Sequence, residues 1–264
     1  MLKFNAPITR LNQIIDAGLH DSKNLDSSIL GELGVYVLRS AFPVEKIARY
    51  YQHYLNYKKA PNFDRTKFHL TEVKISSDNE LKKILQENEF INFIQKFFSG
   101  NVGLYNFRVV KKDGDDTSSV FLHQDVGYHI GSFERYSLFV PLTTCGLSNG
   151  GLKLYPGTHK LGYLGDAGEI KDFLPESYPR LIPDVIPGDV IIMHSAVWHS
   201  SGENKARLDR VYLDIHIQAA DEPSTKEILV GSKKSEWVLN MDHDEIFSSS
   251  RTQKLKALYQ NKTS

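Results

Sequence analysis

The chain has 264 residues, with 32 basic and 32 acidic side chains and a single cysteine. The balanced charge and the absence of a basic stripe argue against nucleic acid or an anionic membrane surface as a partner. Cys145 cannot form an internal disulfide, which favours a reducing, cytoplasmic location. The N-terminus lacks the apolar core of a signal peptide, and no apolar run approaches the ~20 residues of a membrane span.

Helical patterns dominate the first 100 residues. Gly34–Leu38 is an apolar strand candidate, and Pro43 favours the first position of a helix whose apolar stripe follows at helical spacing. Asp78 is placed to cap a second helix. A third helix is predicted over Phe90–Phe98, with Gly100 as its C-terminal stop.

The pattern changes near residue 101, where strands separated by Gly and Pro clusters take over. The predicted strands are 103–111, 120–125, 136–142, 151–155, 189–193 and 211–218. Helices followed by antiparallel strands predict an α+β fold built on a β-sandwich or barrel. We expect one domain over residues 1–264, with a mainly helical lead-in at 1–100, a strand core at 101–218 and a C-terminal extension at 219–264. Residues 161–185 resemble an insertion with a little helix, and Thr252–Tyr259 is a predicted helix.

The last predicted strand has two distinct faces. One face is apolar and would pack on the helices; it consists of Val211, Leu213, Ile215 and Ile217. The other face is polar; it consists of Arg210, Tyr212, Asp214, His216 and Gln218. The polar face indicates either an interior that holds something polar or a surface open to solvent, and the strand alone does not decide between them.

A possible metal site begins at His123-Gln124-Asp125, which ends the predicted strand 120–125. Side chains two apart on a strand share a face, so His123 and Asp125 would project together while Gln124 turns away. One imidazole and one carboxylate supply two ligands of the 2-His-1-carboxylate triad that non-haem Fe(II) oxygenases use. A third ligand must come from elsewhere, and without it the pair is only a polar strand end.

Two histidines compete for the third position. His194 and His199 lie five residues apart in the stretch Met193–Asn204. His159, in the turn Pro156–Lys160, is a ligand-type residue that we interpret as structural. Cys145 has no Cys partner and no evident base beside it, so a catalytic thiol is not expected.

These motifs together resemble the phytanoyl-CoA dioxygenase family of Fe(II)- and 2-oxoglutarate-dependent oxygenases. The matches fall in the family's order and spacing over roughly residues 101–218: His123-Gln124-Asp125, Asn149-Gly150-Gly151-Leu152, Pro156-Gly157-Thr158-His159-Lys160, Pro187-Gly188-Asp189, and His199 to Asn204 followed by Arg210. The strand at Gly34–Leu38 and the helix after Pro43 match the family's opening more loosely.

The resemblance implies a double-stranded β-helix, or jelly roll, with the N-terminal helices packed on its outer sheet. It implies His123, Asp125 and His199 as iron ligands, because Ser201-Gly202-x-Asn204 follows the distal histidine as in the family. It also implies Arg210 and Ser201 as residues that bind 2-oxoglutarate, since a planar guanidinium suits a buried carboxylate. Comparison with ectoine hydroxylase, one member, adds Arg108 and Ser137 to that set.

The implied activity is hydroxylation of an unactivated C–H in a small polar molecule, with release of succinate and CO2. Fe(II), 2-oxoglutarate and O2 would be required, ascorbate would activate the enzyme in vitro, and no catalytic side chain beyond the metal site is implied. Tyr128, His129 and Arg135 border the expected substrate position and suggest a polar or anionic molecule from a biosynthetic pathway. His129 stands where ectoine hydroxylase has an aromatic residue that holds its substrate, which argues against ectoine.

Two other functions stay open at this point. One is a jelly-roll metal enzyme without 2-oxoglutarate, such as a cupin-type isomerase, and the other is a non-catalytic binding module that keeps the fold. Arg210 and Ser201 argue against the isomerase, and retention of the three ligands argues against the binding module. In related halogenases a small residue replaces the carboxylate ligand, so the presence of Asp125 favours hydroxylation over chlorination. The oligomeric state and the identity of the substrate are not indicated.

Overall fold

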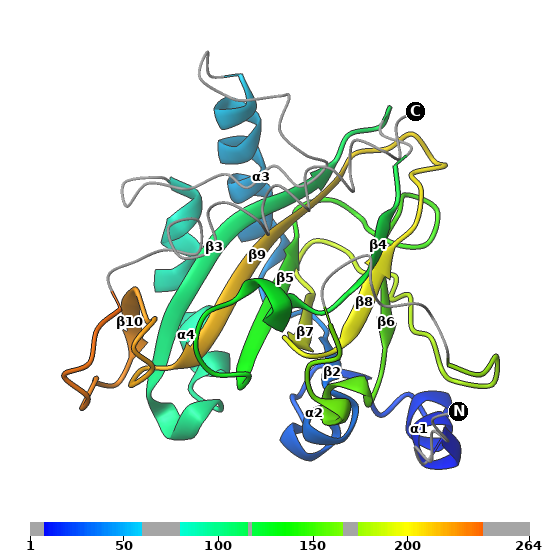
Figure 1. Ribbon diagram of the computed structural model, residues 1–264. Helices are drawn as coiled ribbons and strands as arrows, with labels where there is room; N and C mark the ends of the chain where they lie inside the picture. The colour runs from blue at the N-terminus through cyan, green and yellow to red at the C-terminus, as the bar shows by residue number, and fades with distance from the viewer. Residues whose placement is uncertain (1–7, 60–79, 116–117, 166–173, 240–264) are drawn as a thin grey trace.

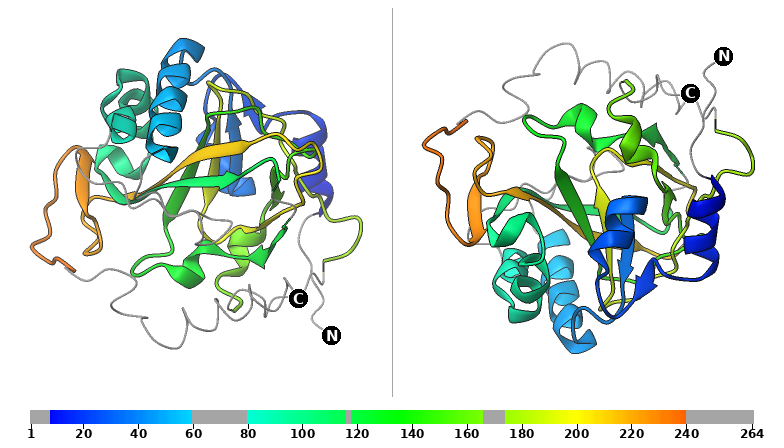
Figure 2. Two further views of the ribbon diagram at one scale, coloured as in Figure 1. Left: turned by 90° about the horizontal axis from the view of Figure 1, so that it is seen from above. Right: turned by 90° about the horizontal axis from the view of Figure 1, so that it is seen from below.

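The computed structural model describes residues 8–59, 80–115, 118–165 and 174–239. Its helices are α1 (Ile8–Asp16), α2 (Ser27–Leu33), α3 (Val44–Lys58) and α4 (Asn88–Ile94), with short 3-10 helices η1 (Glu80–Gln86), η2 (Phe98–Gly100), η3 (Asp125–Tyr128) and η4 (Thr158–Leu161). Within these residues no helix is long and apolar enough to cross a membrane. Helices α3 and α4 lie together on one side of the long strands (Figures 1 and 2).

The strands form two sheets. The strands are β1 (Asp21–Ser22), β2 (Val35–Leu38), β3 (Val102–Lys112), β4 (Val120–His123), β5 (Arg135–Pro141), β6 (Leu152–Tyr155), β7 (Val190–His194), β8 (Trp198–Ser201), β9 (Arg210–Ala219) and β10 (Glu227–Val230). The larger sheet has the order β1-β2-β7-β5-β9-β3-β10 and the smaller one β4-β8-β6. Every pairing is antiparallel except that of β1 with β2. The smaller sheet stands beside the larger one, on the side away from α3 and α4 (Figure 2), and the expected α+β jelly roll is confirmed.

One hydrophobic core joins the larger sheet to the helices. The apolar face of β9 belongs to it, as the alternating sequence predicts. Opposite lie fully buried helix residues that include Leu81, Ile84, Phe90 and Ile94. Burial of such side chains stabilises each by about 1.5–3 kcal/mol relative to exposure, so this layer holds the helices on the sheet.

A second core lies between the two sheets, and it decides which interpretation of β9 holds. Tyr212 of β9 packs there with Phe139 of β5 and Leu154 of β6. The other residues of the polar face, Arg210, Asp214, His216 and Gln218, are all at most 1% exposed. This face therefore lines a polar interior and not a solvent surface.

Several element boundaries differ from the sequence prediction. Helix α3 begins at Val44, with Pro43 immediately before it. The helix expected over Phe90–Phe98 ends at Ile94, because Phe97 and Phe98 pack on Tyr136 of β5, with ring centroids 5.0 and 5.9 Å away. The short strands β8 and β10 carry no clear alternation and were not predicted. Asp78 and Thr252–Tyr259 lie outside the described residues, as does much of the expected insertion at 161–185.

Candidate metal centre

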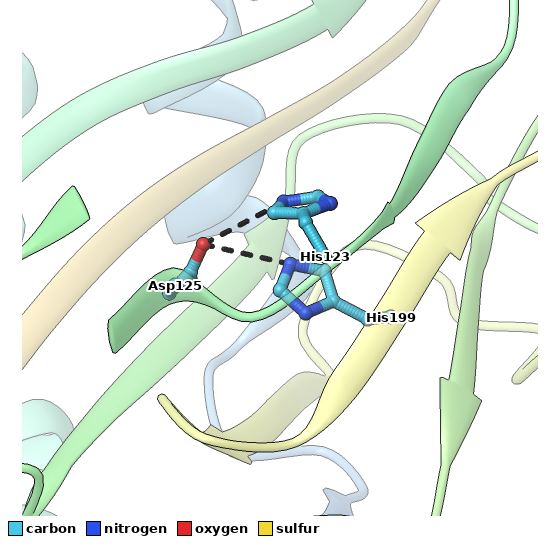
Figure 3. Close-up of side chains that lie close together, drawn as sticks. All are labelled: His123, Asp125 and His199. Carbon is cyan, nitrogen blue, oxygen red and sulfur yellow. Dashed lines mark ion pairs between the residues drawn. The ribbon is translucent and has the colours of Figure 1, made fainter. Parts of the chain in front are cut away.

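Three side chains from two strands and a loop converge between the sheets. His123, Asp125 and His199 are buried, and each offers one ligand atom within 4.8 Å of the others. Asp125 Oδ1 lies 3.7 Å from His123 Nε2 and 3.5 Å from His199 Nε2. Figure 3 shows the carboxylate oxygen directed at both imidazole rings. Two nitrogens and one oxygen with this spacing are the donor set of a facial triad for a divalent metal ion.

The pairing of the smaller sheet brings the two histidines together. His123 ends β4 and faces His199 of β8 across the antiparallel ladder. Asp125 lies past the strand end, where it begins the 3-10 helix η3, so the predicted strand 120–125 is two residues too long. Gln124 between them is still extended, which turns it away as expected. Its amide donates to the carbonyl oxygens of Ala196 and Gly162, at 2.7 and 2.8 Å, and this holds the loop in place.

Backbone carbonyls fix the orientation of both imidazoles. His123 Nδ1 lies 2.9 Å from the carbonyl oxygen of Phe121, and His199 Nδ1 lies 3.0 Å from that of Val197. A carbonyl only accepts, so each Nδ1 is the donor, which leaves Nε2 of each ring as the nitrogen that faces Asp125 and can bind a metal ion in its deprotonated form. Hydrogen bonds of this kind to the outer ring nitrogen are typical of metal-bound histidines.

The electrostatics of the triad favour a cation. Burial, together with the neighbouring His199, lowers the pKa of His123 to about 3, so this imidazole is neutral. Burial alone would raise the pKa of Asp125, but the charge of His199 and its hydrogen bond lower that pKa well below the usual value. Burial alone would lower the pKa of His199, but Asp125 raises it. The ionised, buried carboxylate of Asp125 therefore attracts positive charge, which a divalent metal ion would supply in place of the proton on His199.

Ser137 lies next to this centre. It is fully buried on β5, and its hydroxyl donates to Asp125 Oδ2 at 3.1 Å. This bond leaves Oδ1, the oxygen nearest the two histidines, for a metal ion. The sequence comparison implied a contact between Ser137 and 2-oxoglutarate; the contact with Asp125 is the one present, and the cosubstrate contact stays a prediction.

The residues expected to bind the distal carboxylate of 2-oxoglutarate are also buried. Arg210 is 1% exposed, and its Nη1 donates to the carbonyl oxygen of Gly150 at 2.6 Å. Gly150 has a φ of +74°, and a Cβ there would lie 2.7 Å from the carbonyl oxygen of Gly202, so only glycine fits this turn. Ser201 is 4% exposed, and its Oγ is buried with no hydrogen-bond partner among the described residues. A buried hydroxyl without a partner is consistent with a site that a ligand completes.

Arg108 participates in a buried polar chain on the inner face of the larger sheet. Its Nε donates to Asp214 Oδ2 at 2.6 Å, and His216 Nε2 lies 3.0 Å from Asp214 Oδ1. Asp214 and His216 are fully buried, and the charges of His216 and Arg108 lower the pKa of Asp214 although burial opposes this. The sequence placed both residues on the polar face of β9 but gave them no role, because only the three-dimensional pairing of β9 with β3 brings Arg108 opposite Asp214.

Of the three residues expected near a substrate, Tyr128 packs beside His123, and His129 and Arg135 lie within electrostatic range of Asp125. The ring of Tyr128 is 6.0 Å from that of His123. The ring of His129 is 4.8 Å from His216 and 5.0 Å from Tyr105. Arg135, the first residue of β5, is fully buried with its guanidinium 3.7 Å from the centre of the Tyr105 ring.

The remaining candidate residues are elsewhere. His194 Nδ1 accepts from the backbone N–H of Ala196, and its ring lies 5.1 Å from that of His159. Neither belongs to the group around Asp125, which is the single candidate metal cluster within the described residues. Cys145 is buried, donates to the carbonyl oxygen of Thr143, and has its pKa raised by burial, all of which make a poor nucleophile.

Comparison with known sequences matches residues 32–211 to the model of the phytanoyl-CoA dioxygenase family. The chain is 31% identical over 93 residues to "Dioxygenase andF" of Emericella variicolor, covering 32% of this chain and 30% of that protein. It is 29% identical over 164 residues to the peroxisomal phytanoyl-CoA dioxygenase of Mus musculus, covering 54% of this chain and 47% of that protein. The matched region thus spans about a third to a half of these curated relatives.

Solved structures with the same fold match this chain at low sequence identity. EctD from S. alaskensis, solved with 2-oxoglutarate and 5-hydroxyectoine, has a TM-score of 0.64 at 17% identity and covers 81% of this chain and 82% of its own. The α-ketoglutarate-dependent epimerase SnoN from nogalamycin biosynthesis has a TM-score of 0.62 at 16% identity, covering 82% of this chain and 92% of its own. At these identities the likeness establishes the shared fold.

Proposed function

Because this chain belongs to the phytanoyl-CoA dioxygenase family, we propose that it is an Fe(II)- and 2-oxoglutarate-dependent dioxygenase that hydroxylates an unactivated C–H of a small polar molecule in a biosynthetic pathway. The observation that carries the proposal is the convergence of His123, Asp125 and His199, with the Nε2 atoms of the two histidines 3.7 and 3.5 Å from one carboxylate oxygen. Three protein ligands leave coordination positions open, which a cosubstrate and O2 require.

The donor set fits Fe(II). Neutral imidazoles and one carboxylate suit a borderline divalent ion, and the buried charge of Asp125 favours its binding. His123 and His199 are each braced at Nδ1 by a carbonyl, and Asp125 by Ser137, so little motion is needed to form the three bonds. Bound there with 2-oxoglutarate, iron would supply the activation of O2 that yields succinate, CO2 and the oxidised substrate.

The residues proposed for 2-oxoglutarate are Arg210, Ser201, Arg108 and Ser137. Arg210 brings a buried guanidinium, which pairs with a carboxylate through two parallel hydrogen bonds. Ser201 lies on β8 two residues after His199, and its buried hydroxyl has no other partner among the described residues. A jelly-roll isomerase without 2-oxoglutarate would have no need of this pair.

The residues at and after the proposed metal ligands bear on the reaction outcome and on the substrate. Asp125 occupies the position that a halide takes in related halogenases, so we propose oxygen transfer and not chlorination. Tyr128, His129 and Arg135 are the proposed substrate contacts. The cytoplasmic location expected from the single cysteine stays part of the proposal.

The test is a metabolite screen with the purified full chain, Fe(II), 2-oxoglutarate and ascorbate, in which succinate formation is measured. A metabolite that stimulates succinate release is then turned over under 18-O-labelled dioxygen with chloride present. We expect one labelled oxygen in succinate and one in the product, with allowance for exchange with water. The His123→Ala variant serves as the inactive control. Failure of the native protein to bind 2-oxoglutarate in the presence of Fe(II) would contradict the proposal, and a chlorinated product would contradict the role given to Asp125.

A further inference from the structure

Arg135 carries a buried positive charge that forms no ion pair with any of the described residues and lies within electrostatic range of Asp125. Arg135 is fully buried, although Gly131, Phe133 and Glu134 just before it in the chain are exposed. Its Nε and Nη2 donate to Gln218 Oε1 at 2.8 and 2.5 Å, and Nη2 also donates to the carbonyl oxygen of Ile130 at 2.8 Å. The third nitrogen, Nη1, is buried and has no hydrogen-bond partner among the described residues.

Among the described residues, the hydrogen-bond acceptors of Arg135 are neutral. Gln218 and Ile130 contribute uncharged oxygens, and Tyr105 contributes a ring face. None of the described carboxylates forms an ion pair with Arg135; Glu222 and Asp125 act on it at longer range. Burial lowers the pKa of this guanidinium to about 10, so it stays protonated at neutral pH. A buried charge that lacks a paired opposite charge destabilises the fold, so the presence of Arg135 at this position indicates a role other than folding.

The register of β5 relates this charge to the metal centre. Arg135 and Ser137 are two apart on the same strand face, and Ser137 donates to Asp125. The ring of His129 contacts Tyr105, the same ring on which the Arg135 guanidinium stacks. The Nδ1 atom of His129 is buried and has no hydrogen-bond partner among the described residues. Two polar atoms without a partner among the described residues, Arg135 Nη1 and His129 Nδ1, therefore belong to side chains that contact one aromatic ring, and Arg135 lies two residues along β5 from Ser137, which touches the triad.

We propose that Arg135 is the counter-ion of an anionic substrate, whose carboxylate or phosphate group accepts a hydrogen bond from Nη1 beside His129. This deepens the proposed function and rests on it for the statement that the ligand is a substrate. A charge-assisted hydrogen bond to a buried guanidinium is about twice as strong as a neutral one and would fix one end of the molecule. With that end held, the remainder of the molecule is placed beside the open coordination positions of the metal.

The experiment measures anion binding without turnover. The full chain is loaded with Zn(II), which uses the same ligands without redox chemistry, and with saturating 2-oxoglutarate, which occupies the Arg210 site. The probes are acetate, inorganic phosphate and acetamide, the neutral match of acetate, each titrated by calorimetry. We expect acetate to bind at least tenfold more tightly than acetamide, and Arg135→Gln to weaken acetate binding at least tenfold. Comparison of acetate with phosphate distinguishes a carboxylate substrate from a phosphorylated one.

Matched variants separate this site from others. Arg49→Gln removes an arginine whose side chain is 64% exposed and should leave acetate binding unchanged. If Arg135→Gln fails to fold, Arg135→Lys takes its place in the titration. It keeps the charge but loses the planar fork, so it should bind acetate more weakly than the native protein but more tightly than acetamide. Equal binding of acetate and acetamide would overturn the proposal. So would acetate binding that survives Arg135→Gln, since the anion would then be on the metal or elsewhere.

The outcome is independent of the oxygenase activity. Absence of succinate formation with every metabolite would count against the proposed function, whereas the acetate titration needs neither O2 nor turnover. If both hold, the metabolites that stimulate succinate release should be anions. Their amides or dephosphorylated forms should lose that stimulation in the native protein, and the Arg135→Lys variant should show a raised KM for the anion with a smaller change in KM for 2-oxoglutarate.

Discussion

His123 and His199 are direct cross-strand partners, the last residue of β4 facing the second residue of β8. Their ring centroids are 4.1 Å apart. The backbone hydrogen bonds between β4 and β8 therefore fix the positions of these two candidate metal ligands, which lie far apart in the sequence. Asp125 then needs only one extended residue and the start of a 3-10 helix to reach the same point.

Replacement of His199 by Ala should remove one of the three ligands, whereas replacement of His194 should not. Loss of groups that merely orient a ligand reduces metal affinity about 10- to 100-fold, so loss of the ligand itself should cost about 100-fold or more. Calorimetric titration with Zn(II) and Fe(II) under anaerobic conditions measures the metal affinity of each variant. His123→Ala, which removes the other histidine ligand, should show a loss of similar size. If His194→Ala lost metal binding and His199→Ala kept it, the assignment would be wrong.

Replacement of Arg210 by Lys should weaken 2-oxoglutarate binding more than tenfold while Fe(II) binding survives. Lysine keeps the charge but cannot make two parallel bonds to a carboxylate, and charge-assisted hydrogen bonds contribute roughly 1.5–3 kcal/mol. The measurement is the dissociation constant of 2-oxoglutarate in the presence of Zn(II). An unchanged constant would exclude Arg210 as the residue that binds the distal carboxylate.

Local sequence signals predict part of the fold and of the triad. The alternation of β9 predicts one face toward the helices, and the spacing of His123 and Asp125 predicts that they project together, whereas the choice of His199 over His194 comes from the resemblance to the family. What it could not predict depends on tertiary pairing. The strand before Asp125 ends early because Gln124 is held by carbonyls from loops far away in the chain, and Phe97 leaves its helix to pack on Tyr136.

The polar interior illustrates the same limit. The face that contains Asp214 and His216 is equally polar whether it meets water or another sheet, and only the presence of β4, β8 and β6 opposite it decides. Likewise, the sequence suggests Arg135 as a surface or substrate residue without indicating that its charge is buried. Cross-strand register, and not local composition, determines these properties.

Replacement of Asp214 by Asn should raise the KM for 2-oxoglutarate several-fold with little change in metal affinity. Asp214 holds Arg108 by a 2.6 Å hydrogen bond and is fully buried, so the neutral amide would hold the guanidinium less firmly. The folded state should also lose about 1–3 kcal/mol, because the partly buried guanidinium of Arg108 loses its charged partner. Glu45→Gln on the exposed face of α3 is the control. A lower melting temperature with an unchanged KM would indicate that Asp214 supports only the fold.

Replacement of His194 by Gln should make the protein less sensitive to acid. Burial lowers the pKa of His194 to about 4, as it does for His159 beside it, where His194 adds to the effect. The ring of His194 faces His159 at 5.1 Å and the exposed carboxylate of Glu134 at 3.6 Å, and its Nδ1 accepts from Ala196 N–H, which requires the neutral form. The unfolded value is about 6.5. The folded pKa is therefore depressed for a base, so the stability is fully present above pH 6.5 and is lost as the pH falls toward 4.

The variant should therefore be somewhat less stable than the native protein near pH 8, because it loses the bond to Ala196, but its free energy of unfolding should fall less steeply below pH 6.5. The difference in slope should not exceed one proton, about 1.4 kcal/mol per pH unit. Urea unfolding of the metal-free protein from pH 4 to pH 8 measures it, since metal release would otherwise add its own pH dependence. His53→Gln, at a side chain 39% exposed on α3, is the matched control. Parallel curves for the native protein and His194→Gln would mean that the ring takes up its proton in the fold as readily as in the unfolded chain, contrary to its burial.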